Sequence, residues 1–471
     1  MIATHLPTTD SAQPNDTAQS IEAFNHPTLS DQGRSLLRWL REHPNAPRFT
    51  GHTGSRLCAD DIVLVQERAA VVLESPGPTS TTPMWLQSFV DRALTVVPFF
   101  RPYNLASGTV LAAIPTTNRK NLSTDVAQFV PDDIDASELI TYVTSGTTGH
   151  PLSVPSHPRV AAEYLAYHRR ALHRLGMELQ AGSDSVGVVL LGFQKECFTY
   201  TSVVPTQGEA GLVKLNLHPS AWRSESDGAP YLEALNAEVI AGDPISFAEL
   251  LRIAPACRPR VLFSTSMTLL PGLRSELERS FRCPVLDFYS MNEAGPIGVF
   301  DKAAGGHVLL QPELLVELLD PSGNPVVDGE RGEITLTGGF NFCLPLLRYR
   351  TGDFASMGTH RCSSGRVEQV LVDLAGREPV RFCTSSGEWI NNVDILHTFN
   401  PLTLSQFCVH QSVDGTLTLS IQGSSRNVLQ AQDLLRALMG SLKIALSTIH
   451  PAAEKVKQFT SDFPGSMGAW S

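Results

Sequence analysis

Residues Tyr142-Val-Thr-Ser-Gly-Thr-Thr-Gly-His-Pro151 form the stretch that says most about the fold. Four hydroxyl side chains and two glycines fall within the six residues Thr144–Gly149, directly after an apolar, strand-like lead. Glycines allow the backbone N–H groups of a loop to turn inward, and hydroxyls add further donors, so such a loop can hold phosphate groups. The spacing of a Walker A loop is absent. Taken alone, the hexapeptide fits an ordinary polar turn equally well.

On either side of this loop, from about residue 60 to 340, apolar runs alternate with helical patterns, which predicts α/β layers. The clearest expected strands are Val186–Gly192, Leu212–Leu217, Val239–Ala241 and Val261–Ser264. Apolar spacing predicts one helix over residues 28–45 and another over Pro158–Leu179, with Ser156 as the N-cap of the second.

After about residue 305, short strand-like pieces separated by Gly- and Asp-containing turns predict a β-rich subdomain. The last hundred residues predict strands, one helix over Asn427–Leu442 and a short final strand. We therefore expect a large N-terminal body of layered mixed sheets and helices with a β-rich subdomain, followed by a small, mobile α+β C-terminal domain. The expected boundaries are a loose arm over 1–25, the large domain over 26–374 and the lid domain over 375–471.

The overall composition excludes several classes of function. Among 471 residues, 36 Lys and Arg face 47 Asp and Glu, a formal net charge of −11. Nucleic-acid binders carry a concentrated positive excess, so no nucleic-acid partner is expected. The longest apolar runs are far shorter than the roughly 18 residues of a membrane helix, so no membrane association is expected. The N-terminus lacks the features of a secretory signal, and the eight cysteines are scattered, which predicts reduced thiols and a cytoplasmic location.

Four further segments stand in order around the loop: Ile114–Leu122, Val285–Gly298, Gly329–Glu333 and Leu344–Asp353. The second contains Tyr-Ser-Met-Asn-Glu, and the fourth ends in Arg-Tyr-Arg-Thr-Gly-Asp. Together with the loop, these segments resemble the adenylate-forming superfamily of acyl-CoA synthetases, peptide-synthetase adenylation domains and luciferases. The fourth segment is most similar to the phenylacetate–CoA ligase branch of that superfamily, which includes coenzyme F390 synthetase-like proteins.

The resemblance implies how the phosphates of ATP are bound. Mg²⁺ prefers a few carboxylates together with phosphates, and Glu293 is its implied ligand. Glu293, Thr148 and Asn292 are the implied catalytic residues. The loop residues implied to hold the phosphates are Thr144, Ser145, Gly146, Thr147, Thr148 and Gly149.

The resemblance also implies the nucleoside contacts. Tyr289 would lie against adenine, with Ser290 beside it, and Asp353 would accept hydrogen bonds from the ribose hydroxyls. Arg377 would mark the hinge before the small domain and approach the ribose. In isolation, Tyr289 is better interpreted as a core aromatic and Glu293 as a surface carboxylate.

Several positions depart from the pattern of the superfamily. Ser290 replaces the glycine of its Tyr-Gly-x-Thr-Glu element, Asn292 replaces the threonine, and His150 stands where a basic residue usually follows the phosphate loop. Efficient members also carry a late lysine in a Gly-Lys turn, whereas Ala469 stands near that place here. Loss of one such charge-stabilising donor commonly costs about 10²–10³ in rate.

Some relatives in this branch bind a structural zinc through a Cys, a His and a Cys-Pro-Cys-Gly-Arg run. His307 and Cys362 match two of these ligands, but Ser364 replaces the last thiol and no cysteine lies just before His307. Structural zinc takes about four ligands, so no zinc is expected.

The implied reaction has two steps. A small carboxylic acid, usually aromatic in this branch, attacks ATP to give acyl-AMP and pyrophosphate. The acyl group then passes to coenzyme A or to the phosphopantetheine arm of an acyl carrier protein, in a biosynthetic pathway. The alternatives are a catalytically silent nucleotide-binding relative and an acyl-protein synthetase that loads one of its own cysteines.

An acidic carrier protein would need a basic docking patch on this enzyme. Solvated helix faces are the simpler interpretation of the arginines that could form one. The candidates are Arg169, Arg170, Arg174, Arg252, Arg258, Arg260, Arg274, Arg279 and Arg282.

Overall fold

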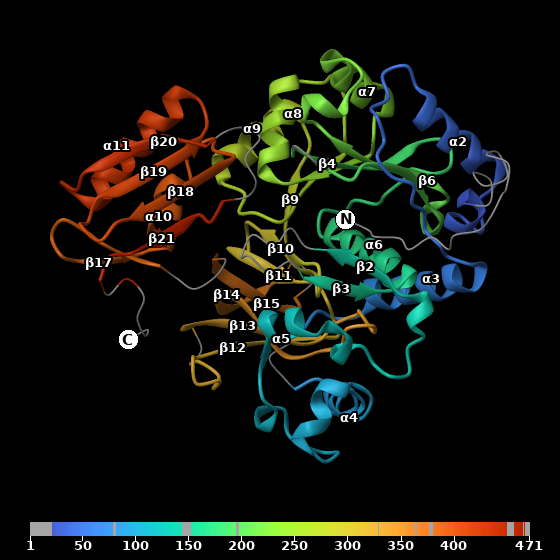
Figure 1. Ribbon diagram of the computed structural model, residues 1–471, viewed down its shortest axis with the longest axis horizontal. Helices are drawn as coiled ribbons and strands as arrows, with labels where there is room; N and C mark the ends of the chain where they lie inside the picture. Colours follow the sequence, from blue (N-terminus) through green and yellow to red (C-terminus); the bar gives the residue numbers. More distant parts are fainter. Residues whose placement is uncertain are drawn as a thin grey trace.

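The computed structural model describes residues 21–78, 82–143, 152–194, 197–327, 329–362, 365–375, 380–449, 456–464 and 466. Within these residues, the largest element is a thirteen-stranded mixed sheet in the order β12-β13-β14-β15-β11-β10-β9-β8-β7-β4-β6-β5, with β1 beside β14. A four-stranded sheet built from the C-terminal residues lies apart from it (Figure 1). The α/β class predicted from the sequence is confirmed.

One half of the large sheet is parallel and carries helices on both faces. Because such strands are buried on both sides, they appear in the sequence as continuous apolar runs, and two of the expected strands match β4 and β8 residue for residue. Helices α2, α7, α8 and α9 share one apolar core with the sheet, and α6 packs on the other face. The strands are β9 (Val285–Met291), β8 (Val261–Ser264), β7 (Val239–Gly242), β4 (Val186–Gly192), β6 (Ala210–Asn216) and the antiparallel edge strand β5 (Tyr200–Val204). The helices are α2 (Asp31–Glu42), α6 (Pro158–His173), α7 (Gly228–Leu235), α8 (Pro244–Ile253) and α9 (Pro271–Phe281).

The other half of the sheet is antiparallel and corresponds to the predicted β-rich subdomain. The two-residue strand β1 (Thr117–Asn118) adds in parallel beside the long strand β14. The antiparallel strands are β10 (Gly295–Asp301), β11 (Gly306–Leu309), β15 (Val367–Ala375), β14 (Leu346–Arg361), β13 (Arg331–Gly338) and β12 (Leu314–Leu319).

Smaller elements surround this sheet. Helix α3 (Ala59–Glu74) packs against α6, and α4 (Leu86–Val96) lies at the lower tip in Figure 1. The other pieces are α5 (Arg119–Thr124) and the hairpin of β2 (Ile140–Val143) and β3 (Ser153–Ser156). The short 3₁₀ helices are η1 (Pro98–Tyr103), η2 (Leu111–Ala113), η3 (Val126–Phe129), η4 (Ala136–Glu138), η5 (Pro205–Gln207), η6 (Pro219–Ala221) and η7 (Glu225–Asp227).

The described residues from 380 onward form a C-terminal module with its own apolar core. Leu270, just before α9, is buried in that core, and the N–H of Gly272 donates to the carbonyl of Asn400 at 2.9 Å. A Cβ atom at Gly272 would lie 2.3 Å from the carbonyl oxygen of Leu402, so this close approach requires glycine. The module contains β16 (Arg381–Cys383), β17 (Trp389–Asn391), α10 (Asn392–Phe399), β18 (Gln406–Gln411), β19 (Leu417–Gln422), α11 (Ser425–Met439), β20 (Ile444–Thr448) and β21 (Phe459–Ser461). The domain boundary at 374/375 stays a prediction.

Several local expectations were wrong. The cap of α6 is His157, whose Nδ1 accepts the N–H of Arg159 at 3.1 Å, because Ser156 is the last residue of β3. The same helix ends at His173, shortly before Gly176, which has a left-handed φ of 64°. Residues 21–25 of the expected arm are helical, and α10 is a second helix in the C-terminal module that the apolar pattern did not indicate.

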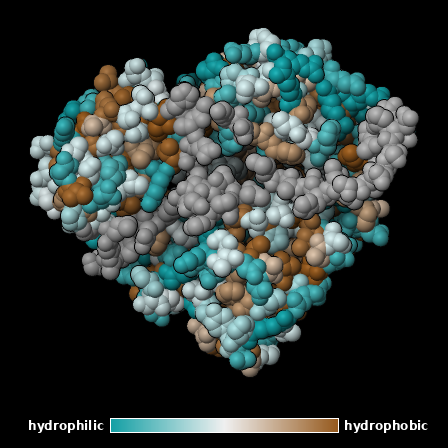
Figure 2. Space-filling model, in the orientation of Figure 1, coloured by the Kyte–Doolittle hydropathy of each residue, from teal (hydrophilic) through white to brown (hydrophobic). Residues whose placement is uncertain are grey.

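The surface is mixed in character. In Figure 2, hydrophilic residues in teal and residues of intermediate hydropathy in white cover much of the visible face, and apolar residues in brown form smaller groups between them. None of the helices in the described ranges combines the length and apolar character that a membrane span needs.

Candidate active site

Glu293 follows strand β9 and is a buried carboxylate, 2% exposed. Its Oε1 accepts a hydrogen bond of 2.7 Å from the hydroxyl of Tyr349 on β14. A carboxylate buried in this way needs a donor, because burial without one is costly. Burial and the negative charge of Glu293 raise the pKa of Tyr349 well above its ordinary value, so the phenol stays protonated and continues to donate.

Tyr289 and Asp353 form a second tyrosine–carboxylate pair. The hydroxyl of Tyr289 donates to Oδ2 of Asp353 at 2.9 Å, and burial raises the pKa of this tyrosine well above its ordinary value. The backbone N–H of Asp353 donates to Oγ1 of Thr351 at 3.0 Å, which fixes the turn that presents the carboxylate. The pairs are crossed: the chain around β9 supplies a tyrosine and then a carboxylate, and β14 supplies their partners in the reverse order.

Arg119, the first residue of α5, lies beside the first pair. Its Nη1 is 3.8 Å from Oε1 of Glu293, and its side chain is 30% exposed. Thr117 sets its position by pairing with Tyr349 in the parallel β1–β14 ladder and donating from Oγ1 to the carbonyl of Leu347 at 3.2 Å. The site therefore contains a cation next to its buried carboxylate.

The other two predicted residues of the β9 segment lie at the surface side of this site. Asn292 is exposed, and its backbone carbonyl accepts a hydrogen bond of 3.3 Å from the hydroxyl of Tyr164 on α6. Ser290 is half-buried and pairs with Pro296 in the β9–β10 ladder. Their predicted roles toward a nucleotide stay predictions.

The predicted phosphate loop and Arg377 lie outside the described residues. The strands that flank the loop are described, and Tyr142 on β2 pairs with Val154 on β3. Tyr142 packs against the apolar cluster that contains Tyr289, and its burial raises its pKa to about 12. The roles of Thr144, Ser145, Gly146, Thr147, Thr148, Gly149 and Arg377 stay predictions.

The donors present at this site fit a magnesium ion shared with a nucleotide. Mg²⁺ in such sites takes one or two carboxylates and completes its shell with substrate phosphates and water, and Glu293 offers one carboxylate held in place by Tyr349. In the ranges that the structure describes, no group of three or more His, Cys, Asp or Glu side chains is arranged to hold a metal ion by itself.

His307, one of the two residues that match the zinc ligands, lies in a buried polar group behind Tyr289. Its Nε2 is 4.0 Å from Oδ2 of Asp287, which Arg274 also contacts at 3.4 Å. Burial lowers the pKa of His307 to about 3 and raises that of Asp287 to about 7. Ser364 lies outside the described residues, and the expectation that the chain holds no zinc stays a prediction.

Sequence reasoning missed three residues of the site: Arg119, Tyr164 and Tyr349. Arg119 and Tyr349 both lie inside segments that carried the resemblance, Ile114–Leu122 and Leu344–Asp353. The available signal was a polar side chain within a matched segment, at the start of a helix for Arg119 and in a buried part of a strand for Tyr349. Tyr164 gave no such signal, because a tyrosine in an amphipathic helix is usually a packing residue.

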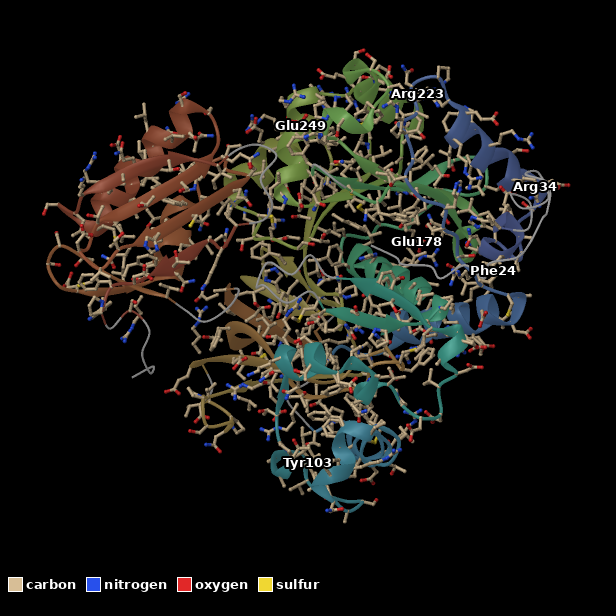
Figure 3. All side chains as sticks on the ribbon, in the orientation of Figure 1. Phe24, Arg34, Tyr103, Glu178, Arg223 and Glu249 are labelled. Carbon is tan, nitrogen blue, oxygen red and sulfur yellow. The ribbon has the colours of Figure 1, made fainter. Side chains whose placement is uncertain are left out.

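The arginines considered for a docking patch are largely engaged within the chain. Arg174 contacts Asp301 at 2.6 Å and Glu368 at 2.7 Å. Arg170 donates to the carbonyl of Val72. The remaining ion pairs are Arg252–Glu249, Arg260–Glu238 and Arg274–Asp287, of which Glu249 is labelled in Figure 3.

Comparison with known proteins gives sequence matches to phenylacetate-coenzyme A ligases. The chain is 30% identical to the enzyme of Escherichia coli over 131 residues, which are 25% of this chain and 30% of that protein. It is 24% identical to the enzyme of Thermus thermophilus over 255 residues, 50% of this chain and 54% of that protein. The matched part therefore spans about half, or less, of these relatives. No protein-family model matches the sequence.

Solved structures with the same fold include 2-hydroxyisobutyryl-CoA ligase. In the postadenylation state, in complex with R3-HIB-AMP, it matches 84% of this chain and 90% of its own with a TM-score of 0.61 at 16% identity. In the thioesterification state, with 2-HIB-AMP and CoA, the TM-score is 0.51 over 87% and 91% of the chains, also at 16% identity. The chain thus has the fold of these CoA ligases and is similar in sequence to parts of the phenylacetate-coenzyme A ligases.

Proposed function

We propose that this protein is an ATP-dependent acid–thiol ligase that converts a carboxylic acid to an acyl-AMP and transfers the acyl group to a phosphopantetheine thiol. The observation that carries the proposal is the crossed arrangement of Tyr289–Asp353 and Tyr349–Glu293. It brings together the β9 segment and the β14 segment, which carry the predicted nucleotide-binding residues. The sequence similarity to phenylacetate-coenzyme A ligases supports the same reaction class.

Each side chain has a role that follows from its position. The Asp353 carboxylate accepts hydrogen bonds from the ribose, while its contact with Tyr289 keeps it oriented. The tyrosine ring offers an apolar face to adenine. Glu293, oriented by Tyr349, is the carboxylate that would hold Mg²⁺. That ion, when bound, neutralises phosphate charge as pyrophosphate leaves.

Holding the acid near the α-phosphorus is the main task of the site, because orientation supplies much of the rate acceleration in such transfers. An aromatic acid is our proposed substrate class, and the thiol is that of coenzyme A or of an acyl carrier protein. The proposed C-terminal lid, 375–471, would move between the two steps. Its contacts with Leu270, just before α9, and with Gly272 in α9 are the places where such a movement would break packing.

The test is pyrophosphate exchange with ATP and Mg²⁺ across a panel of aromatic and aliphatic acids. We expect exchange that depends on one class of acid. A second round adds coenzyme A or a phosphopantetheinylated carrier protein and follows the thioester by mass. The absence of exchange with every acid, although ATP binds, would favour the catalytically silent alternative, which Asn292 in place of the expected threonine also suggests.

A further inference from the structure

Arg119 is a cation in contact with Glu293, and the resemblance assigns it no role. Two features fix it in place. The backbone before it is held along β14 by the pairing of Thr117 with Tyr349. The first turn of α5 is closed by Asn118 and Asn121, whose side chains each accept the backbone N–H of the other, at 3.2 and 3.0 Å. The backbone of Arg119 is thus held in a defined position next to the carboxylate.

The two side chains of this pair differ in how much of their surface is exposed to solvent. Glu293 is 2% exposed, whereas the side chain of Arg119 is 30% exposed, so the arginine is the more solvent-accessible member of the pair. Their separation of 3.8 Å exceeds the length of a hydrogen bond, so this is a long ion pair and not a bidentate one. A guanidinium carries five N–H donors in a planar fork that suits phosphate oxygens.

Resting on the ATP-dependent function proposed above, we propose that Arg119 binds the phosphates of ATP beside Glu293. A nucleotide that enters from solvent meets this cation before it reaches the buried carboxylate. Before binding, Arg119 partly neutralises Glu293. With phosphates and Mg²⁺ bound, Glu293 would coordinate the metal, and the guanidinium of Arg119 would donate hydrogen bonds to the phosphate oxygens. Arg119 thereby supplies positive charge directly beside the carboxylate that would hold the metal.

The test compares the equilibrium binding of ATP and AMP, each with MnCl₂ and without any acid substrate, in four proteins. These are the wild type, Arg119→Gln, Arg119→Lys and the matched control Lys120→Gln, which removes the neighbouring cation of the same helix. We expect Arg119→Gln to weaken ATP binding by about tenfold to a hundredfold, the range for a hydrogen bond to a charged group. AMP binding should change much less, Arg119→Lys should retain part of the ATP affinity, and Lys120→Gln should behave as the wild type.

A second measurement distinguishes phosphate binding from a structural role. Binding of Mn²⁺ alone, at millimolar concentration, should become tighter in Arg119→Gln, because a positive charge beside Glu293 has been removed. If Mn²⁺ binding instead weakens together with ATP binding, Arg119 only holds Glu293 in place and the proposal is overturned. Unchanged ATP affinity in Arg119→Gln, or equal losses for ATP and AMP, also overturns it.

These outcomes separate the proposal from the function on which it rests. If the wild type binds ATP but supports no acid-dependent pyrophosphate exchange, and Arg119→Gln still loses its preference for ATP over AMP, the ligase function fails and the role of Arg119 stands. If exchange occurs and Arg119→Gln binds ATP normally, the ligase function stands and the proposed role of Arg119 fails. A wild type that does not bind ATP overturns both.

Discussion

Tyr289 and Asp353 are joined by a hydrogen bond of 2.9 Å, although β10, β11 and β15 separate their strands in the sheet. The contact therefore does not come from strand pairing. Asp353 lies within the long strand β14 (Leu346–Arg361), directly after Gly352, whose φ is 79°. The geometry of the candidate site therefore depends on the path of β14 at this glycine as well as on the residues that form the site.

Replacing Glu293 with Gln should abolish acid-dependent pyrophosphate exchange, with a loss on the order of 10²–10³ or more, typical when one charge-stabilising group is removed at a reacting phosphate. The amide can still accept from Tyr349, so the fold should persist. Circular dichroism and the midpoint of thermal unfolding check this. Exchange that survives in the variant would contradict the metal-binding role of Glu293.

Replacing Tyr349 with Phe should destabilise the protein, because Glu293 stays buried without its 2.7 Å donor. The expected loss in the free energy of unfolding is about 1–3 kcal/mol, the cost of leaving a buried polar group unsatisfied. Urea unfolding measures it. The matched control is Tyr103→Phe, since Tyr103 is 46% exposed at the lower end of the molecule in Figure 3. Equal losses in both variants would mean that the buried hydrogen bond contributes nothing specific.

Replacing Gly272 with Ala should loosen the contact between α9 and the C-terminal module. In an exposed helix this change usually stabilises, but here the new Cβ would lie 2.3 Å from the carbonyl oxygen of Leu402. We expect overpacking to cost about 1–3 kcal/mol, seen as faster hydrogen exchange at Gly272 and Leu402. The control is Gly182→Ala, where the nearest atom to a new Cβ is 4.0 Å away. Unchanged exchange in Gly272→Ala would show that the contact is absent in solution.

Replacing His307 with Gln should change how stability depends on pH. Folded Asp287, with a pKa raised by burial to about 7, holds a proton that the unfolded chain releases near pH 4, so this group makes stability fall as pH rises from about 4 to 7. Folded His307, with a pKa lowered by burial to about 3, lacks a proton that the unfolded chain binds below about pH 6.5, so it makes stability rise over much of the same range. In the wild type the two effects oppose each other.

The His307→Gln variant keeps only the effect of Asp287, while Arg274 remains beside it. Its loss of unfolding free energy relative to the wild type should therefore be larger at about pH 7 than at about pH 4.5. Urea unfolding at the two pH values measures this difference. A loss that is independent of pH would show that His307 titrates in the folded protein much as it does in the unfolded chain.

The sequence predicted the parts of this fold that are locally encoded. Strand β4 and strand β8 were found to the residue, because strands buried on both faces are continuous apolar runs. The cap of α6 was not, because a histidine took the place of the expected serine. In the site, the motifs named Tyr289, Glu293 and Asp353, but the hydrogen bonds that orient them join residues 64 and 56 positions apart. No local pattern encodes such pairs.

The parallel pairing of Thr117 with Tyr349 also has a consequence for protein synthesis. The hydroxyl of Thr117 bonds to a carbonyl 230 residues further along the chain. A nascent polypeptide emerging from the ribosome cannot fix the start of α5, nor place a cation beside Glu293, until β14 has been translated. Truncated or stalled chains should therefore lack an organised candidate site even when the predicted phosphate loop and the whole parallel half of the sheet have already been translated.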